Sequence, residues 1–204
     1  MELQLLIGTT NKGKYNEMAA VLDQLPITLL NPLQLGITDD VEETGTTYQE
    51  NALIKAKFYA LNSGGITTLG EDSGIVVDSL ANELGVYTRR FGAGPKATDS
   101  EWLDFFMDRM QEFKSPEQRT AKFISHMCLL INNAPVHFYG ETLGIITDSV
   151  EAPLYEGVPL SSVFKPKGFD IVYSSMTEDQ KNQISHRGKA ITQVKNYLAE
   201  YYAL

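Results

Sequence analysis

The chain has 204 residues, enough for one large domain or two closely joined lobes, and 43% of them are hydrophobic, as in ordinary globular proteins. A formal net charge of −9 argues against nucleic acid as a partner, because phosphate backbones attract basic surfaces. No apolar run approaches the ~20 residues of a membrane span and no signal-peptide pattern opens the chain, so we expect a cytoplasmic protein with no membrane partner.

The first predicted elements are a strand at residues 3–8 and an amphipathic helix after it. The apolar face of this helix carries Met18, Val21, Leu22 and Leu25. Between strand and helix lies TTNKGK, residues 9–14, and a helix N-terminus is a ready anion site. The candidate phosphate contacts are Thr9, Thr10, Asn11 and Lys14. A plain N-cap followed by a solvated lysine is the alternative interpretation.

A second helix is predicted within residues 46–65, where Thr47 and Glu50 form a capping box and two glycines end the helix. Its Lys55 is either a solvated side chain or a cation that faces a site. After this helix, two short strands at residues 66–70 and 74–80 are predicted to flank a corner that carries Glu71 and Asp72. Glu43 together with Asp72 would supply the hard oxygen ligands that Mg²⁺ prefers, with Glu42 or Glu71 as alternative second ligands.

The middle of the chain predicts a third amphipathic helix at residues 99–113, followed by a hairpin. The hairpin strands lie at residues 120–131 and 136–147 and flank the turn pair Asn132 and Asn133. The only cysteine, Cys128, falls in the first of these strands, so a buried thiol without an internal disulfide is expected, in keeping with a reducing compartment. One more strand is predicted within residues 161–168.

The last 28 residues predict two helices with a break near Ser185. The inward positions of the final helix are Ile191, Val194, Leu198 and Tyr201. The tripeptide Ser185, His186 and Arg187 at the break either presents several donors to a planar polar ligand or is an N-cap followed by two surface residues. Strands and helices alternate first and a hairpin follows, which predicts an α/β fold with a mixed sheet.

Taken in order, these segments resemble one family, the inosine/xanthosine triphosphate pyrophosphatases. The family pattern T-x-N-x-x-K-x-x-E matches Thr9, Asn11, Lys14 and Glu17. The further matches are ETGTTYQENALIKA at 43–56, EDSGIVVD at 71–78, GVYTRRF at 85–91, GETLGII at 140–146 and SHRGKA at 185–190. Each motif alone is weak, but the collinear set spans nearly the whole chain.

The resemblance implies a single ITPase-like domain over residues 1–204, with flanking helices and two lobes around a central cleft. It implies a homodimer that uses Mg²⁺ to cleave a purine nucleoside triphosphate to the monophosphate and pyrophosphate. By position, the triphosphate would be held by Thr9, Thr10, Asn11, Lys14 and Lys55. Asp72 would be the catalytic base and, with Glu43, a metal ligand. The nucleotide and its base would be lined by Ser73, Lys181, His186 and Arg187.

One segment departs from the family pattern. Leu160 and Ser161 stand where the family usually carries an aromatic residue and an aspartate, and two extra residues precede Phe164. An aromatic stack can contribute ~1–3 kcal/mol per base, so we expect the phosphate chemistry to persist with altered base selectivity. The alternatives are the same chemistry on another base and a nucleotide-binding protein with reduced turnover.

Overall fold

The computed structural model describes residues 3–39, 41–80, 83–85, 92, 94 and 96–204, so residues 86–91 of the GVYTRRF motif lie outside the described part. Within the described residues, six strands form one sheet in the order β2-β1-β3-β4-β5-β6. The strands are β1 (Gln4–Gly8), β2 (Thr28–Leu30), β3 (Thr67–Val77), β4 (Thr120–Ile131), β5 (Ala134–Ile146) and β6 (Phe164–Pro166). The α-helices are α1 (Lys12–Leu22), α2 (Tyr48–Asn62), α3 (Asp99–Met110), α4 (Glu178–Ile184) and α5 (His186–Tyr202).

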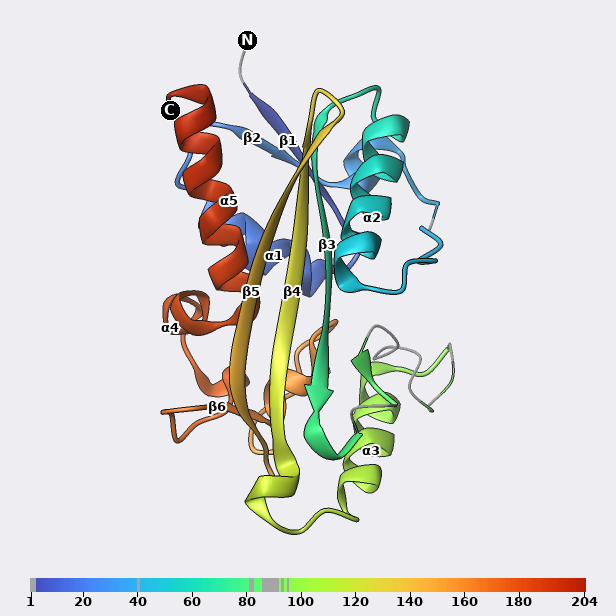
Figure 1. Ribbon diagram of the computed structural model, residues 1–204, viewed down its shortest axis with the longest axis vertical. Helices are drawn as coiled ribbons and strands as arrows, with labels where there is room; N and C mark the ends of the chain where they lie inside the picture. Colours follow the sequence, from blue (N-terminus) through green and yellow to red (C-terminus); the bar gives the residue numbers. More distant parts are fainter. Residues whose placement is uncertain (1–2, 40, 81–82, 86–91, 93, 95) are drawn as a thin grey trace.

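The sheet is mixed, as predicted. β1 runs parallel to β2 and β3, whereas the pairs β3–β4, β4–β5 and β5–β6 are antiparallel. Figure 1 shows the long strands β3, β4 and β5 running through the molecule, with α1, α2 and α5 around one half and α3 at the other. The described chain contains no helix that is both long and apolar enough to cross a membrane.

Two of the four apolar clusters among the described residues form the cores of the predicted lobes. The first lobe is packed between the sheet, α1 and α5, with Leu5, Met127 and Val194 in its core. The second lobe is packed around α3, with Phe106 and Phe164 in its core. Because β3 and β4 contribute to both cores, the two lobes share one continuous sheet and meet at a cleft.

Two glycines let helices approach the sheet closely. A Cβ on Gly70 would lie 2.2 Å from the carbonyl oxygen of Ala52 in α2. A Cβ on Gly140 would lie 2.1 Å from the carbonyl oxygen of His186 at the start of α5. Since backbone and side chain cannot share that space, glycine at both positions lets polar side chains of α2 and α5 reach β3.

The prediction of a corner at the acidic pair is wrong. β3 is a single strand, and β4 pairs with it without interruption from Thr68 to Val77. Glu71 and Asp72 therefore lie in the middle of a central strand, where their side chains point to opposite faces of the sheet. Gly70, which suggested a turn, instead makes room for α2.

The hairpin and both terminal helices are confirmed. Asn132 and Asn133 have φ values of 49° and 63°, the left-handed conformations that a two-residue hairpin turn requires. Ser185 ends α4 and caps α5 by accepting a hydrogen bond from the backbone N–H of Gly188. Cys128 is fully buried, as expected, and burial raises the pKa of its thiol to about 11.

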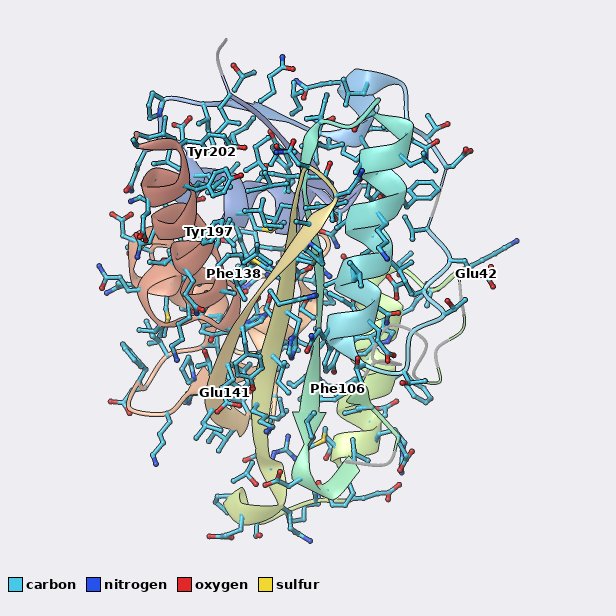
Figure 2. The ribbon with its side chains drawn as sticks, turned by 45° about the horizontal axis from the view of Figure 1, so that its top comes forward. Glu42, Phe106, Phe138, Glu141, Tyr197 and Tyr202 are labelled. Atoms are coloured by element: carbon cyan, nitrogen blue, oxygen red, sulfur yellow. The ribbon has the colours of Figure 1, made fainter. Side chains whose placement is uncertain are left out.

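Four details differ from the sequence prediction. Leu25, predicted on the apolar face of the first helix, lies beyond the end of α1 at Leu22, although it still packs against the core of the first lobe. The inward placement of Tyr201 is wrong: this residue is 51% exposed, because Tyr197 and Tyr202 pack against the core in the last turns of α5. Figure 2 shows Tyr197 beside Phe138 of β5, and their ring centroids are 5.7 Å apart. The third helix ends at Met110, three residues early, and the short edge strand β2 was not predicted.

Candidate active site

A cleft of about 610 Å³ lies between the two lobes. It is lined by the loop after β1 and by residues of α1, α2, α3, β3, α4 and α5. The sequence-predicted site residues that line it are Thr9, Thr10, Asn11, Lys14, Glu43, Lys55, Asp72, Ser73, Lys181, His186 and Arg187. Residues more than 170 positions apart in the chain are thus brought to one place, as the collinear motifs predicted.

The loop after β1 and the start of α1 form one end of the cleft. Asn11 is the N-cap of α1, and its Oδ1 accepts a hydrogen bond from the backbone N–H of Lys14 at 3.0 Å. The amide group of Asn11 also donates to the carbonyl oxygen of Gly157 at 3.1 Å, a contact that joins this loop to the second lobe's side of the cleft. The N-cap interpretation is therefore correct for Asn11, and the same cap leaves a helix N-terminus facing the cleft.

Lys55 of α2 pairs with two carboxylates beside this end of the cleft. Its ammonium group lies 2.6 Å from Glu43 Oε1 and 3.0 Å from Asp72 Oδ1. The other oxygen of Asp72 accepts a hydrogen bond from the amide of Asn51 at 3.0 Å. Burial alone would lower the pKa of Lys55, but the charges of Asp72, Glu43 and Glu71 raise it overall. Lys55 is therefore a charged residue of the cleft and not a solvated surface lysine.

Glu71 lies on the other face of β3 and is 1% exposed. Its Oε2 is 2.9 Å from the ammonium group of Lys14, and its Oε1 accepts from the guanidinium of Arg187 at 3.2 Å and from the hydroxyl of Ser125 at 3.1 Å. Burial would raise the pKa of Glu71, but Lys14, Arg187 and Lys55 outweigh it and hold the pKa well below its usual range. Glu71 thus anchors cations of the cleft, and it does not itself line the cavity.

Glu17 of α1 also anchors cations of the cleft, here near the start of α5. Its carboxylate pairs with both Lys181 and Arg187. Burial would raise the pKa of Glu17, but the two cations lower it overall. The remaining N–H groups of Arg187 donate to Glu71 and, at 3.0 Å, to the hydroxyl of Ser73. The side chain of Arg187, on α5, is thereby fixed by two other elements, α1 and β3.

His186 is buried between aromatic rings. Its imidazole stacks on Phe123 with a centroid separation of 4.6 Å and an interplanar angle of 11°, and the ring centroid of Tyr173 is 6.4 Å from that of the imidazole. Burial, and then the charge of Arg187, hold the pKa of His186 well below its ordinary value. A neutral imidazole in this position offers one donor and one acceptor nitrogen. Within the described structure, its Nδ1 has no hydrogen-bond partner.

The charged side chains that pair with one another around the cleft balance in number. Four cations and four carboxylates alternate through the contacts above: Lys14, Lys55, Lys181 and Arg187 with Glu17, Glu43, Glu71 and Asp72. Because this network carries no net formal charge, a polyanionic ligand would have to displace a carboxylate from a lysine or bring a cation with it.

The possible metal ligands are two carboxylates. No group of three or more acidic, histidine or cysteine side chains suited to a metal ion occurs among the described residues. Glu43 and Asp72 do converge, since both contact the same ammonium group in the cleft. Glu42, the alternative ligand, is exposed and lies at the periphery of the molecule in Figure 2, away from the cleft lining. Two carboxylates completed by substrate phosphates are a common Mg²⁺ arrangement, so the donor set fits this ion.

Several residues of the site were not predicted from the sequence. Asn51 orients Asp72, and Glu17 orients Lys181 and Arg187. Both residues fall within the quoted family motifs. The motifs marked these positions but did not indicate which side chains they contact. Trp102 also lines the cleft from α3, and nothing in its sequence context distinguished it from an ordinary core residue.

Comparison with known proteins gives matches over nearly the whole chain. The model of the Ham1 family matches residues 5–197. A dITP/XTP pyrophosphatase of Geobacter sulfurreducens is 36% identical over 196 residues, 96% of each chain, and one of Leptospira interrogans is 32% identical over 200 residues, 97% of this chain and 98% of that protein. A solved HAM1 protein from Coxiella burnetii superposes with a TM-score of 0.82 at 30% identity, covering 97% of this chain and 99% of that one.

Proposed function

The chain belongs to the Ham1 family, and on that premise we propose that it is a nucleoside triphosphate pyrophosphatase. The substrates are nonstandard purine nucleotides, namely ITP, dITP and XTP, which are cleaved to the monophosphate and pyrophosphate. The observation that carries this proposal is the cleft, in which a helix N-terminus, lysines and a pair of carboxylates line one cavity.

The phosphate end of the cleft supports binding of a triphosphate. Thr9, Thr10 and Asn11 line it with hydroxyl and amide groups next to the N-terminus of α1, where unpaired backbone N–H groups favour anions. Lys14 and Lys55 supply full positive charges there. We propose that phosphate oxygens replace Glu71 as the partner of Lys14 when the substrate binds, because that ammonium group is the partly exposed member of the pair.

The enzyme is proposed to depend on Mg²⁺ held by Glu43 and Asp72. When bound, the ion would neutralise phosphate charge and polarise the reacting phosphate. The balanced charge of the cleft supports this proposal, because a triphosphate entering a neutral network needs a countercharge. Lys55 holds the two carboxylates together.

Asp72 is the proposed catalytic base. It accepts a proton from a water molecule as the oxygen of that water attacks the α-phosphorus. The bond from the α-phosphorus to the oxygen that bridges to the β-phosphate breaks, and pyrophosphate leaves with the electron pair. Asn51 and Lys55 occupy one lone-pair direction on each oxygen of Asp72, which fixes its orientation and leaves acceptor capacity for the water. A general base of this kind typically contributes ~10²–10⁴-fold.

Ser73, Lys181, His186 and Arg187 are proposed to line the nucleoside. Donors from this group would pair with the keto oxygen at purine C6, which hypoxanthine and xanthine carry and adenine lacks. Leu160 and Ser161 also line the cleft and supply neither a stacking ring nor a carboxylate. We therefore expect ITP and XTP to be preferred over ATP, with weaker rejection of GTP, which carries the same keto group.

A homodimer is also proposed. β5 bears two exposed apolar side chains on one face of the sheet, Leu143 at 50% and Tyr139 at 40%, in the stretch that pairs with β4 alone, and a second copy of the chain would cover them. Leu143→Lys should shift the mass measured by light scattering from dimer to monomer, and a monomeric wild type at micromolar concentrations would reject this assignment.

A cytoplasmic location is proposed from the single cysteine, and cell fractionation tests it.

The experiment that tests the activity is a screen of nucleoside triphosphates with Mg²⁺ in which pyrophosphate release is followed. We expect ITP and XTP to be hydrolysed best and EDTA to abolish turnover. Asp72→Asn should lower kcat by ~10²-fold or more while the circular dichroism spectrum stays unchanged. A purified Asp72→Asn variant with near-normal kcat at saturating Mg²⁺ would show that Asp72 is not the base.

A further inference from the structure

Trp102 is the only tryptophan of the chain and lies in the first turns of α3. Although it lines the cleft, its side chain is held firmly, with 2% of the residue exposed. Its indole stacks on Phe106 with a centroid separation of 5.5 Å and an interplanar angle of 10°. Figure 2 shows Phe106 within the second lobe, where it is fully buried. The ring of Trp102 is therefore a rigid part of the cleft wall.

The indole N–H of Trp102 has no hydrogen-bond partner within the described structure, although the nitrogen is buried. Buried indole N–H groups usually have a partner, and leaving one unpaired costs ~1–3 kcal/mol. Among the cleft-lining side chains that the structure describes, the other with such an atom is His186. Two buried nitrogens that have no partner among the described residues, along one cavity, are placed to pair with a ligand.

Both nitrogens belong to the apolar end of the cleft. Trp102, Phe123 and Leu160 line the cavity and share the core of the second lobe. The imidazole of His186 stacks on Phe123. The lysines that pair with Glu71 and Glu43 belong to α1 and α2, which surround the other half of the molecule (Figure 1). A nucleotide has a charged end and a flat, largely apolar end, so the base fits the end that Trp102 borders.

We propose that Trp102 is a specificity-determining residue that contacts the purine base, with its indole N–H donating to an acceptor atom of the base. This inference rests on the proposed nucleotide substrate. Leu160 brings no aromatic ring to the cleft, and Trp102, which shares its core cluster, supplies an aromatic surface there. Because the nitrogen is shielded from water in the ligand-free cleft, neighbouring side chains must move slightly as the base binds, while the stacked ring stays in place, and the surroundings of the indole N–H then change.

The single tryptophan makes the first test specific to this residue. The protein is labelled with ¹⁵N, and its indole N–H resonance and tryptophan emission are followed while inosine monophosphate or tripolyphosphate is added. We expect the monophosphate to move the N–H resonance downfield and tripolyphosphate, which lacks a base, to bind without moving it. The inference is overturned if calorimetry shows that the monophosphate binds with the signal unmoved, or if tripolyphosphate moves it equally.

The second test removes the N–H group. Trp102→Phe and a protein whose tryptophan is replaced by benzothienylalanine, which has sulfur in place of N–H and nearly the same shape, are compared in hydrolysis of ITP. We expect kcat/KM to fall about tenfold in both, as for the loss of one hydrogen bond, with tripolyphosphate affinity unchanged. Met107→Leu, a conservative change on the same helix in a side chain that does not line the cleft, should leave kcat/KM unaltered.

The outcomes separate this inference from the proposed function. If the wild type neither hydrolyses ITP nor binds inosine monophosphate, the proposed function fails and the role of Trp102 fails with it. If the wild type hydrolyses ITP and both N–H-deficient proteins match it, only the role of Trp102 fails. A loss of thermal stability with unchanged kcat/KM in the benzothienylalanine protein likewise assigns Trp102 to packing alone.

Discussion

Replacing Glu71 by glutamine is expected to destabilise the fold although the two side chains have nearly the same shape. Glu71 is almost fully buried and contacts Lys14, Arg187 and Ser125. Its lowered pKa keeps it ionised at neutral pH. Glutamine removes this charge and leaves the buried guanidinium of Arg187 with Glu17 as its remaining carboxylate.

Breaking a buried ion pair from one side costs ~3–5 kcal/mol. We expect the lower end of this range, about 3 kcal/mol, because Lys14 is partly exposed and Arg187 keeps Glu17. That is a large fraction of the ~5–15 kcal/mol by which folded domains are stable. For a chain of this size it corresponds to a fall in Tm of roughly 6–12 °C.

The assay is urea and thermal unfolding of Glu71→Gln, with Glu141→Gln as the matched control. Glu141 is labelled in Figure 2, and its ion pair with Lys122 at 3.7 Å is exposed, so the same substitution should change stability little there. Tripolyphosphate should raise the Tm of Glu71→Gln more than that of the wild type, because Lys14 is released for the phosphate. A Glu71→Gln protein as stable as the control would refute the anchoring role of this carboxylate.

Three further predictions concern the cleft. Lys55→Ala should raise KM for ITP more than it weakens binding of inosine monophosphate in calorimetry, and equal weakening would place Lys55 at the nucleoside. Arg187→Ala should reduce the preference for ITP over ATP in kcat/KM, and an unchanged ranking would remove Arg187 from base recognition. His186 has a pKa held below its ordinary value of 6.5, so the unfolded chain gains a proton below that pH that the folded protein does not. The free energy of unfolding should therefore fall between about pH 6.5 and 5, by at most ~1.4 kcal/mol per pH unit, and His186→Phe should flatten this slope in urea unfolding. An equally steep slope in that variant would contradict the assignment.

The sequence predicted those parts of the fold that depend on local chemistry. Asparagine adopts left-handed conformations easily, so the pair Asn132 and Asn133 predicted the hairpin turn, and both residues have that conformation. Thr47 and Glu50 form the predicted capping box of α2, with each side chain bonded to the other's backbone. The break at Ser185 was likewise visible, because a serine in extended conformation ends one helix and caps the next.

The errors arose where distant segments decide the structure. Gly70 and Gly74 suggested a corner, but the continuous pairing with β4, some 50 residues later in the chain, keeps β3 straight. The same limitation applies to the site. The motifs located Asp72 and Arg187, but the pairing of Arg187 with Glu17 and Glu71 joins residues 170 and 116 positions apart, and no local pattern encodes it.

The most direct test of the proposed chemistry is hydrolysis of ITP in ¹⁸O-labelled water with Mg²⁺, with the products analysed by mass spectrometry. Attack of water on the α-phosphorus predicts one ¹⁸O atom in inosine monophosphate, none in pyrophosphate, and equal amounts of the two products. Label in pyrophosphate would place the attack on the β-phosphorus, and release of orthophosphate with inosine diphosphate would place it on the γ-phosphorus. Either result would contradict the account of the cleft as a pyrophosphatase site.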